Sequence, residues 1–202
     1  MNRLTITPEQ LTSILQMFKV DMSEWGTEGR ADVHRLLKPL QNGEGALRID
    51  KIGIALVLTT VRALIKNERG EVLIVGYEKR YGKDNRNLAV ANLPGGKVGK
   101  DEDGEDEGIE YALERELNEE AGLRRGRDYT IGGYRKGKGP KRVLSLPNLQ
   151  ADITKYIFEV TLNPGHRLLT LLTFEYTEGK GHKLLFKWIP ETEWLERQDK
   201  MN

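Results

Sequence analysis

The spacing of hydrophobic residues in the first part of the chain is that of helices. Between residues 5 and 20 they recur every three or four positions, and Thr7-Pro8 supplies a cap and a proline for the first turn. The residues with this spacing are Leu11, Ile14, Leu15 and Phe18. A second helix is predicted over residues 31 to 40, ended by Asn42-Gly43. A segment of roughly fifty residues is too small to bury a good core alone. We therefore expect it to pack against the rest of the chain, or against a second copy in a homodimer.

From Gly53 onward the pattern changes to that of strands. Residues 54 to 65 are rich in leucine and β-branched residues, and a hairpin turn is predicted at Asn67–Gly70. Further strands are predicted over residues 71–77, 88–93, 129–133, 155–162 and 183–189. Residues 168 to 176 fit a strand or a helix, and we favour a strand. Residues 134 to 142 are basic and rich in glycine, so a loop is predicted there.

One strong helix is predicted inside this series of strands, over residues 107 to 121, with Gly122 as its C-terminal stop. A last helix is predicted to start in residues 190 to 197. Strands that surround a single strong helix indicate the α/β (α+β) class, built as a mixed α/β sandwich and not as a regular βαβ series.

The strong helix places carboxylates on its apolar side. At about 100° per residue, the apolar residues form one arc and the acids fall on or beside it. The arc consists of Ile109, Ala112, Leu113 and Leu117, with Glu116 and Glu120 inside it and Glu119 at its edge. A buried, unpaired carboxylate is costly, and one arginine, Arg115, cannot neutralise all three even if it pairs with Glu119. A divalent cation can, and oxygen ligands at this spacing suit magnesium. The alternative is an exposed helix whose acids are solvated.

Composition narrows the classes of protein. The 202 residues carry a net charge of +1, so no global field attracts nucleic acid or a membrane. The absence of cysteine excludes disulfides, thiolate catalysis and cysteine-bound metals. The first ten residues lack an apolar signal core, and the longest apolar run, residues 52 to 58, is too short to span a bilayer. A cytoplasmic location is therefore the default expectation.

The acidic helix also carries a recognisable motif. The run from Arg115 to Leu123 reads RELNEEAGL, and it resembles the second half of the Nudix box, R-E-U-x-E-E-x-G-U with U apolar, at every fixed position. Glu107 stands where the box has its first glutamate, and Pro94-Gly95-Gly96 is similar to the glycine turn that opens it. Residues 54 to 77 are similar to the opening hairpin of the family, and residues 187 to 190 to its closing strand and turn.

The resemblance implies a Nudix hydrolase domain over residues 51 to 202, an α/β/α sandwich with a mixed sheet, preceded by an N-terminal helical extension over residues 1 to 50. One departure concerns spacing. The family places five residues between the box glycine and the first glutamate, which would put the glycine at Asp101. We interpret Lys100–Gly104 as a loop insertion. The backbone carbonyl that the family uses as a metal ligand is then assigned to Gly95 or Gly96, and we select Gly96.

The resemblance also implies a mechanism, in which the diphosphate linkage of a nucleoside diphosphate derivative is hydrolysed with Mg²⁺, or Mn²⁺ in its place. Glu116, Glu119 and Glu120 match the metal ligands of the family, and Glu107 and Arg115 match the pair that orients them. The family often adds a later glutamate as a base or a further ligand. The candidates for it are Glu159, Glu175 and Glu178, of which we select Glu178.

Substrate choice lies outside the motif. The predicted basic loop offers Arg135, Lys138 and Lys141 to hold phosphates, although such a loop is as often simply solvated. The competing function is a regulatory module that binds a nucleotide without turnover. Such a module is expected to lack some of the acids of the motif, and this chain has them all. An RNA-processing enzyme would require a broad basic face, so nucleic acid is not the expected partner.

Overall fold

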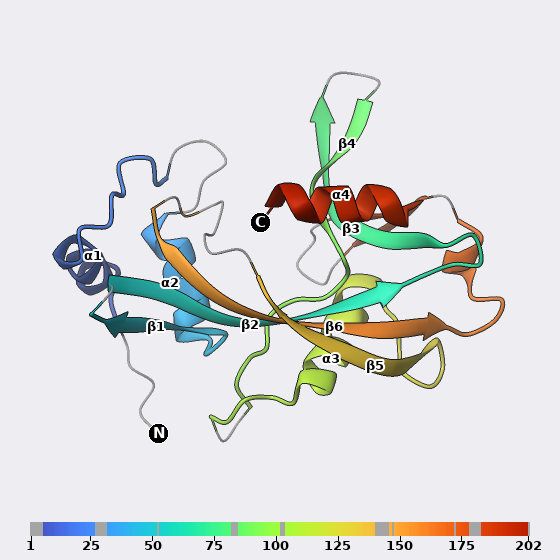
Figure 1. The fold of residues 1–202 in the computed structure, drawn as a ribbon, viewed down its shortest axis with the longest axis horizontal. Helices are drawn as coiled ribbons and strands as arrows, with labels where there is room; N and C mark the ends of the chain where they lie inside the picture. Colours follow the sequence, from blue (N-terminus) through green and yellow to red (C-terminus); the bar gives the residue numbers. More distant parts are fainter. Residues whose placement is uncertain are drawn as a thin grey trace.

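The computed structural model describes residues 6–26, 32–51, 53–81, 85–101, 104–139, 146, 148–171, 173–177 and 183–201. Its elements, labelled in Figure 1, are α1 (Pro8–Met17), α2 (Val33–Gln41), β1 (Gly45–Asp50), β2 (Gly53–Ile65), β3 (Glu71–Tyr81), β4 (Asn85–Asn92), α3 (Ile109–Ala121), β5 (Tyr129–Lys138), β6 (Gln150–Leu162), η1 (Arg167–Leu169), β7 (Thr173–Thr177), β8 (Lys183–Pro190) and α4 (Glu191–Met201). The strands form two four-stranded sheets, with the orders β1-β2-β6-β5 and β4-β3-β8-β7.

The first sheet is mixed, because β2 and β6 run parallel while β1 and β5 are antiparallel to their neighbours. The second sheet is antiparallel throughout. Two helices cover opposite faces of this assembly. The buried residues of α3 share a core with β2, β6 and one face of β3 and β8, whereas Trp194 of α4 packs on the other face of β3 and β8. These layers confirm the predicted α+β sandwich with a mixed sheet.

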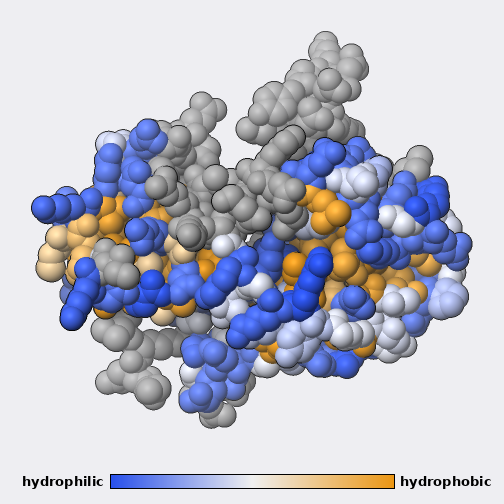
Figure 2. All heavy atoms as spheres, in the orientation of Figure 1, coloured by the Kyte–Doolittle hydropathy of each residue, from blue (hydrophilic) through white to orange (hydrophobic). Residues whose placement is uncertain are grey.

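The N-terminal helices pack against the first half of β2. Thr7 and Gln10 form a capping box at the start of α1, as the Thr-Pro pattern indicated. The apolar faces of α1 and α2 and the start of β2 enclose a second core. Its buried members are Leu11, Leu15, Leu36, Leu37, Ile54, Leu56, Leu58, Leu146 and Leu149. The expectation that this segment packs against the rest of the chain is thus confirmed. Figure 1 shows the two helices at one end of the elongated molecule, and hydrophobic residues reach the surface there in Figure 2.

Two local predictions were wrong. Residues 134 to 138 were expected in a loop, but they continue β5, because they pair with residues 154 to 158 of β6 beyond a bulge. Residues 168 to 176 do not form one strand; a 3₁₀ turn at Arg167–Leu169 precedes the short strand β7. The structure also adds β1, in a segment for which only helices were predicted. Gly70, at φ 73°, closes the predicted turn by donating to the Asn67 carbonyl.

A short extended segment, residues 94 to 98, continues the mixed sheet beyond β1. Val61 donates to the Gly96 carbonyl at 3.0 Å and Ala63 to the Pro94 carbonyl at 2.8 Å, and Val98 donates to the Thr59 carbonyl at 2.9 Å. Since β1 pairs with residues 53 to 58 and β6 occupies the other edge, this segment lies on the edge of β2 that β1 leaves open. The glycine turn is thereby fixed beside α3.

Candidate active site

The ion pair of Arg115 and Glu107 joins α3 to the segment that follows the glycine turn. Arg115 donates to both carboxylate oxygens of Glu107, at 2.7 and 3.1 Å, and its Nη2 also donates to the Lys97 carbonyl at 3.0 Å. The Gly99 amide donates to the same Glu107 carboxylate at 2.6 Å. Burial raises the pKa of Glu107, but the hydrogen bonds from Arg115 and Gly99 outweigh it and leave the pKa below its usual value. Glu107 is thus held as an anion beneath α3.

The same contacts explain the interruption of the motif. The Glu107 amide donates to the Gly99 carbonyl at 3.1 Å, so the residue before the insertion is joined to the first glutamate of the motif. Between them, Lys100 and Asp106 form an isolated bridge, and Gly104 turns with a φ of 84°. α3 therefore still contacts the glycine turn despite the extra residues. This agrees with the interpretation of Lys100–Gly104 as a loop insertion.

The face of α3 that meets the glycine turn carries Glu116 and Glu120. Both positions were predicted on the apolar arc, whose members Ala112, Leu113 and Leu117 are buried. The Glu120 carboxylate accepts a hydrogen bond from the Gly95 amide at 2.8 Å. The Glu116 carboxylate lies directly over Gly96, where a Cβ would approach its carbon and Oε1 to 2.1 Å. Only a glycine leaves room for this carboxylate.

The surroundings of the two carboxylates are poorly hydrated. The Glu116 side chain is 16% exposed and accepts from Arg115 Nη1 at 3.0 Å. Burial raises the pKa of Glu116, and the nearby Arg115 does not compensate fully. Glu119 differs, because its side chain is 47% exposed and lies 3.6 Å from Arg115. The predicted pairing of Arg115 with Glu119 is therefore the weakest of the arginine's contacts.

An arginine that the sequence did not single out completes this region. Arg62 lies on β2, and burial lowers its pKa while the charges of Glu120 and Glu116 act in the opposite direction. Its Nε is buried and has no hydrogen-bond partner among the described residues. The alternation along β2 places Arg62 on the face opposite to Val61 and Ala63, but nothing local indicated that a cation would be half-buried there.

Comparison with known proteins settles the family. The NUDIX domain family profile matches residues 57 to 197, most of the chain. The chain belongs to the Nudix family. It is accordingly a hydrolase that acts on acid anhydrides in phosphorus-containing compounds, and it has a small-molecule substrate. The comparison with curated proteins found no match.

Three solved structures are similar to this Nudix hydrolase at low sequence identity. The MutT protein from Methanosarcina mazei Go1 is 20% identical, with a TM-score of 0.43, over 69% of this chain and 81% of that one. The ORF135 protein of E. coli is 23% identical, with a TM-score of 0.36, over 69% and 78%. A NUDIX hydrolase from Nitrosomonas europaea is 17% identical, with a TM-score of 0.38, over 72% and 79%.

The donors on α3 suit the divalent cation that Nudix hydrolases generally use. Glu116 and Glu120 offer hard oxygen atoms on one helix face, both against the glycine turn, and the glycine leaves space for one of them. In the described part of the chain, however, no three acidic or histidine side chains are gathered as a ready metal site. Glu119 stands apart from these two, because its side chain is half-exposed and only loosely paired with Arg115.

The remaining predicted site residues lie on β5 or β6 or outside the described part of the chain. Arg135 lies on β5, and Lys138 pairs with Asp152 at 2.9 Å with its side chain 71% exposed, so its charge is already compensated. Lys141, Glu178 and the side chain of Glu175 lie outside the described residues. Glu159 is exposed on β6. Among the described helices, none is long and apolar enough to cross a membrane.

Proposed function

We propose that this Nudix hydrolase is a magnesium-dependent pyrophosphohydrolase that cleaves the diphosphate linkage of a nucleoside diphosphate derivative or a related organic pyrophosphate. The observation that supports this most strongly is the convergence of Glu116 and Glu120 on the Gly95–Gly96 turn. The Arg115–Glu107 pair lies directly behind this turn. Manganese is expected to replace magnesium, because both are hard cations that prefer oxygen ligands.

Each box residue receives a role in this proposal. Glu116, Glu119 and Glu120 hold the cation, which when bound neutralises the diphosphate and activates the attacking water. Arg115 and Glu107 position the helix against the glycine turn through their paired hydrogen bonds. Since Glu107 is buried and Arg115 spans from it to the Lys97 carbonyl, the pair fixes the distance between α3 and the turn.

The carbonyl ligand is better assigned to Gly95 than to Gly96. The Gly96 carbonyl accepts from Val61 and therefore points toward β2. The Gly95 amide, in contrast, points at Glu120 on the side of the acids. This favours the first of the two glycines considered from the sequence, and it replaces Gly96 as our proposed backbone ligand.

A turnover assay separates this function from the alternative of a nucleotide-binding module. Nucleoside diphosphate derivatives would be incubated with the protein and magnesium, and the phosphorylated products quantified with and without excess chelator. We expect hydrolysis that stops with chelator and returns with magnesium or manganese. Binding of a nucleotide without any product would favour the module, and full turnover in excess chelator would contradict the metal mechanism.

The matched variants lie on one helix. Glu120→Gln keeps the size of the side chain and removes its charge, and it should lower turnover at least about tenfold, as loss of a metal ligand does. Glu110→Gln makes the same change on the exposed face of α3, where Glu110 pairs with Arg125, and should leave turnover unchanged. Equal rates for the two variants would remove Glu120 from the proposed ligands.

A further inference from the structure

Arg62 is a half-buried cation that uses few of its donors within the described part of the chain. Its Nη1 donates to the Val61 carbonyl at 3.3 Å, a long contact, and its Nε is buried without a partner in the described part of the chain. A guanidinium has five N–H donors in a fixed fork, and a buried donor without an acceptor is costly. Carboxylates of α3 act on Arg62 through their charge, yet no ion pair with it is formed among the described residues.

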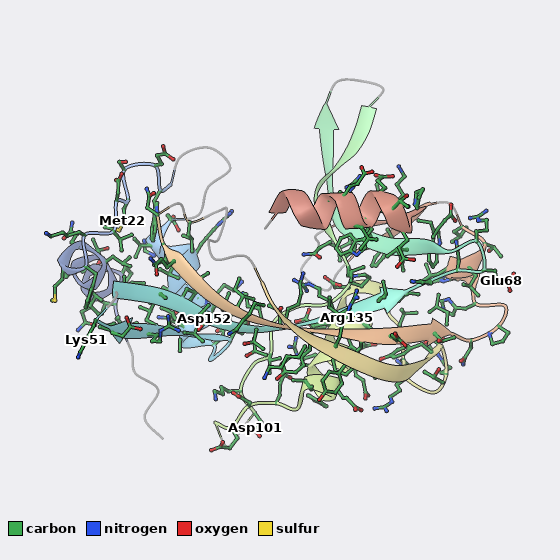
Figure 3. All side chains as sticks on the ribbon, in the orientation of Figure 1. Met22, Lys51, Glu68, Asp101, Arg135 and Asp152 are labelled. Carbon is green, nitrogen blue, oxygen red and sulfur yellow. The ribbon has the colours of Figure 1, made fainter. Side chains whose placement is uncertain are left out.

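The strand register brings two further cations to the same face of the mixed sheet. Arg62 of β2 and Arg135 of β5 are both in register with Ile157 of β6, on its two sides. One step along β6 on the same face is Lys155, in register with Thr60 and Gly137. We name Arg62, Lys155 and Arg135 the cationic row. Figure 3 shows Arg135 near the middle of the molecule, where these three strands run together.

The members of the cationic row lie close enough to repel one another. Burial lowers the pKa of Lys155, and the charges of Arg62 and Arg135 lower it further. Three like charges on one face of a sheet repel one another, and an anion bound between them would relieve this repulsion. Arg135 is exposed to solvent, whereas the buried Nε of Arg62 requires an acceptor.

We propose that the cationic row of Arg62, Lys155 and Arg135 is a phosphate-binding site that positions the diphosphate of the substrate beside the α3 carboxylates. Arg62 is the member of the row that is near enough to Glu120 and Glu116 for their charges to act on it. A phosphate oxygen supplies the acceptors that the Arg62 fork lacks, and the fork matches phosphate geometry. The inference rests on the proposed function for the identity of the ligand, but binding itself is testable without turnover.

The test uses inorganic pyrophosphate as the probe, titrated calorimetrically into the whole chain in excess chelator so that no metal contributes. Lys155→Gln and Arg62→Gln should each weaken binding about tenfold, the usual effect of losing one charge-assisted contact. Lys155→Arg keeps the charge and should retain most of the affinity. The matched control is Lys136→Gln, which removes a charge from β5 on the opposite face, where Lys136 lies over the Tyr156 ring.

Kinetics with a hydrolysed substrate give a second readout. The variants of the cationic row should raise KM more than they lower kcat, because they remove contacts to the ground state as well as the transition state. Melting temperatures identify any variant that does not fold, and Lys155→Gln then carries the test if Arg62→Gln fails. The proposal is overturned if Lys155→Gln binds pyrophosphate like the unmodified chain, or if Lys136→Gln weakens binding equally. A chain that binds pyrophosphate through this row but hydrolyses nothing would refute the proposed function alone.

Discussion

Gly96→Ala is the substitution that tests the site most directly, because the structure predicts which atoms must move. A Cβ at this position would lie 2.1 Å from the carboxylate carbon and Oε1 of Glu116 and 2.3 Å from its Oε2. Since favourable contacts begin near about 3.5 Å, the carboxylate must withdraw by roughly 1.4 Å. Gly96 is not among the glycines with positive φ, so its backbone accepts alanine.

The expected magnitudes separate activity from stability. Misplacement of a catalytic group by about 1 Å costs on the order of a hundredfold in rate, so kcat should fall by about that factor. Stability should change by less than about 1 kcal/mol, because the lower entropy of an unfolded chain with alanine offsets a weakened contact between Glu116 and Arg115. The atoms that must move are at the end of the flexible Glu116 side chain, so their movement costs little stability. Movement of backbone atoms would cost more.

The assay compares three alanine variants in magnesium-dependent turnover and in urea unfolding. At Gly95, with φ 128°, a Cβ would lie 2.4 Å from the Val61 carbonyl oxygen, so Gly95→Ala should lose at least about 2 kcal/mol of stability. At Gly133 a Cβ meets nothing within 4 Å, and Gly133→Ala should change neither quantity. Full activity of Gly96→Ala would refute the reasoning, since Glu116 would then act from another place.

Three further outcomes follow from single contacts, each measured by urea unfolding. Glu107→Gln should destabilise by about 2 kcal/mol, because it leaves the partly buried Arg115 with a weaker partner; a neutral result would make the pair dispensable. Glu44→Gln should cost under about 1 kcal/mol. Burial raises the pKa of Glu44, but the hydrogen bonds from Lys97 and Asn42 and the charges of Lys97 and Arg115 together lower it more, so this cost should be present at pH 7 and disappear as the pH falls below the lowered pKa. Tyr129→Phe should not destabilise, because the Tyr129 hydroxyl is buried with no partner among the described residues. Burial raises the pKa of Tyr129 to about 12, so the unmodified chain should lose stability as the pH rises from 10 toward 12, and the phenylalanine variant should lose less.

The acidic helix could be predicted from the sequence because its information is local. The 3.6-residue period alone placed Glu116 and Glu120 on the apolar arc, and Gly122, with φ 66°, ends the helix as its position indicated. The glycine turn was also foreseen as a partner of the helix. The sequence did not indicate which glycine carbonyl faces the acids. The carbonyl of Gly96 is oriented by its hydrogen bond to β2, and no local pattern encodes that pairing.

The cationic row could not be predicted, because it depends on which strands become neighbours. Arg62 and Lys155 are 93 residues apart in sequence and meet only through the parallel register of β2 and β6. The same dependence explains β1, since the short run Gly45–Asp50 becomes a strand by pairing with β2. It also explains β5, whose Gly137 and Lys138 have weak strand propensity and are ordered by β6.

The position of β1 has a consequence for where the chain can be shortened. The family profile begins at residue 57, yet the first half of β2 relies on β1 for its backbone partners and on α1 and α2 for cover. A chain cut near residue 51 would present an unpaired strand edge beside the bared Ile54, Leu56 and Leu58. Such an edge is a template for adding the same strand of another molecule. We therefore expect a chain without the helical extension to self-associate, because its exposed strand edge and apolar side chains would contact those of other molecules.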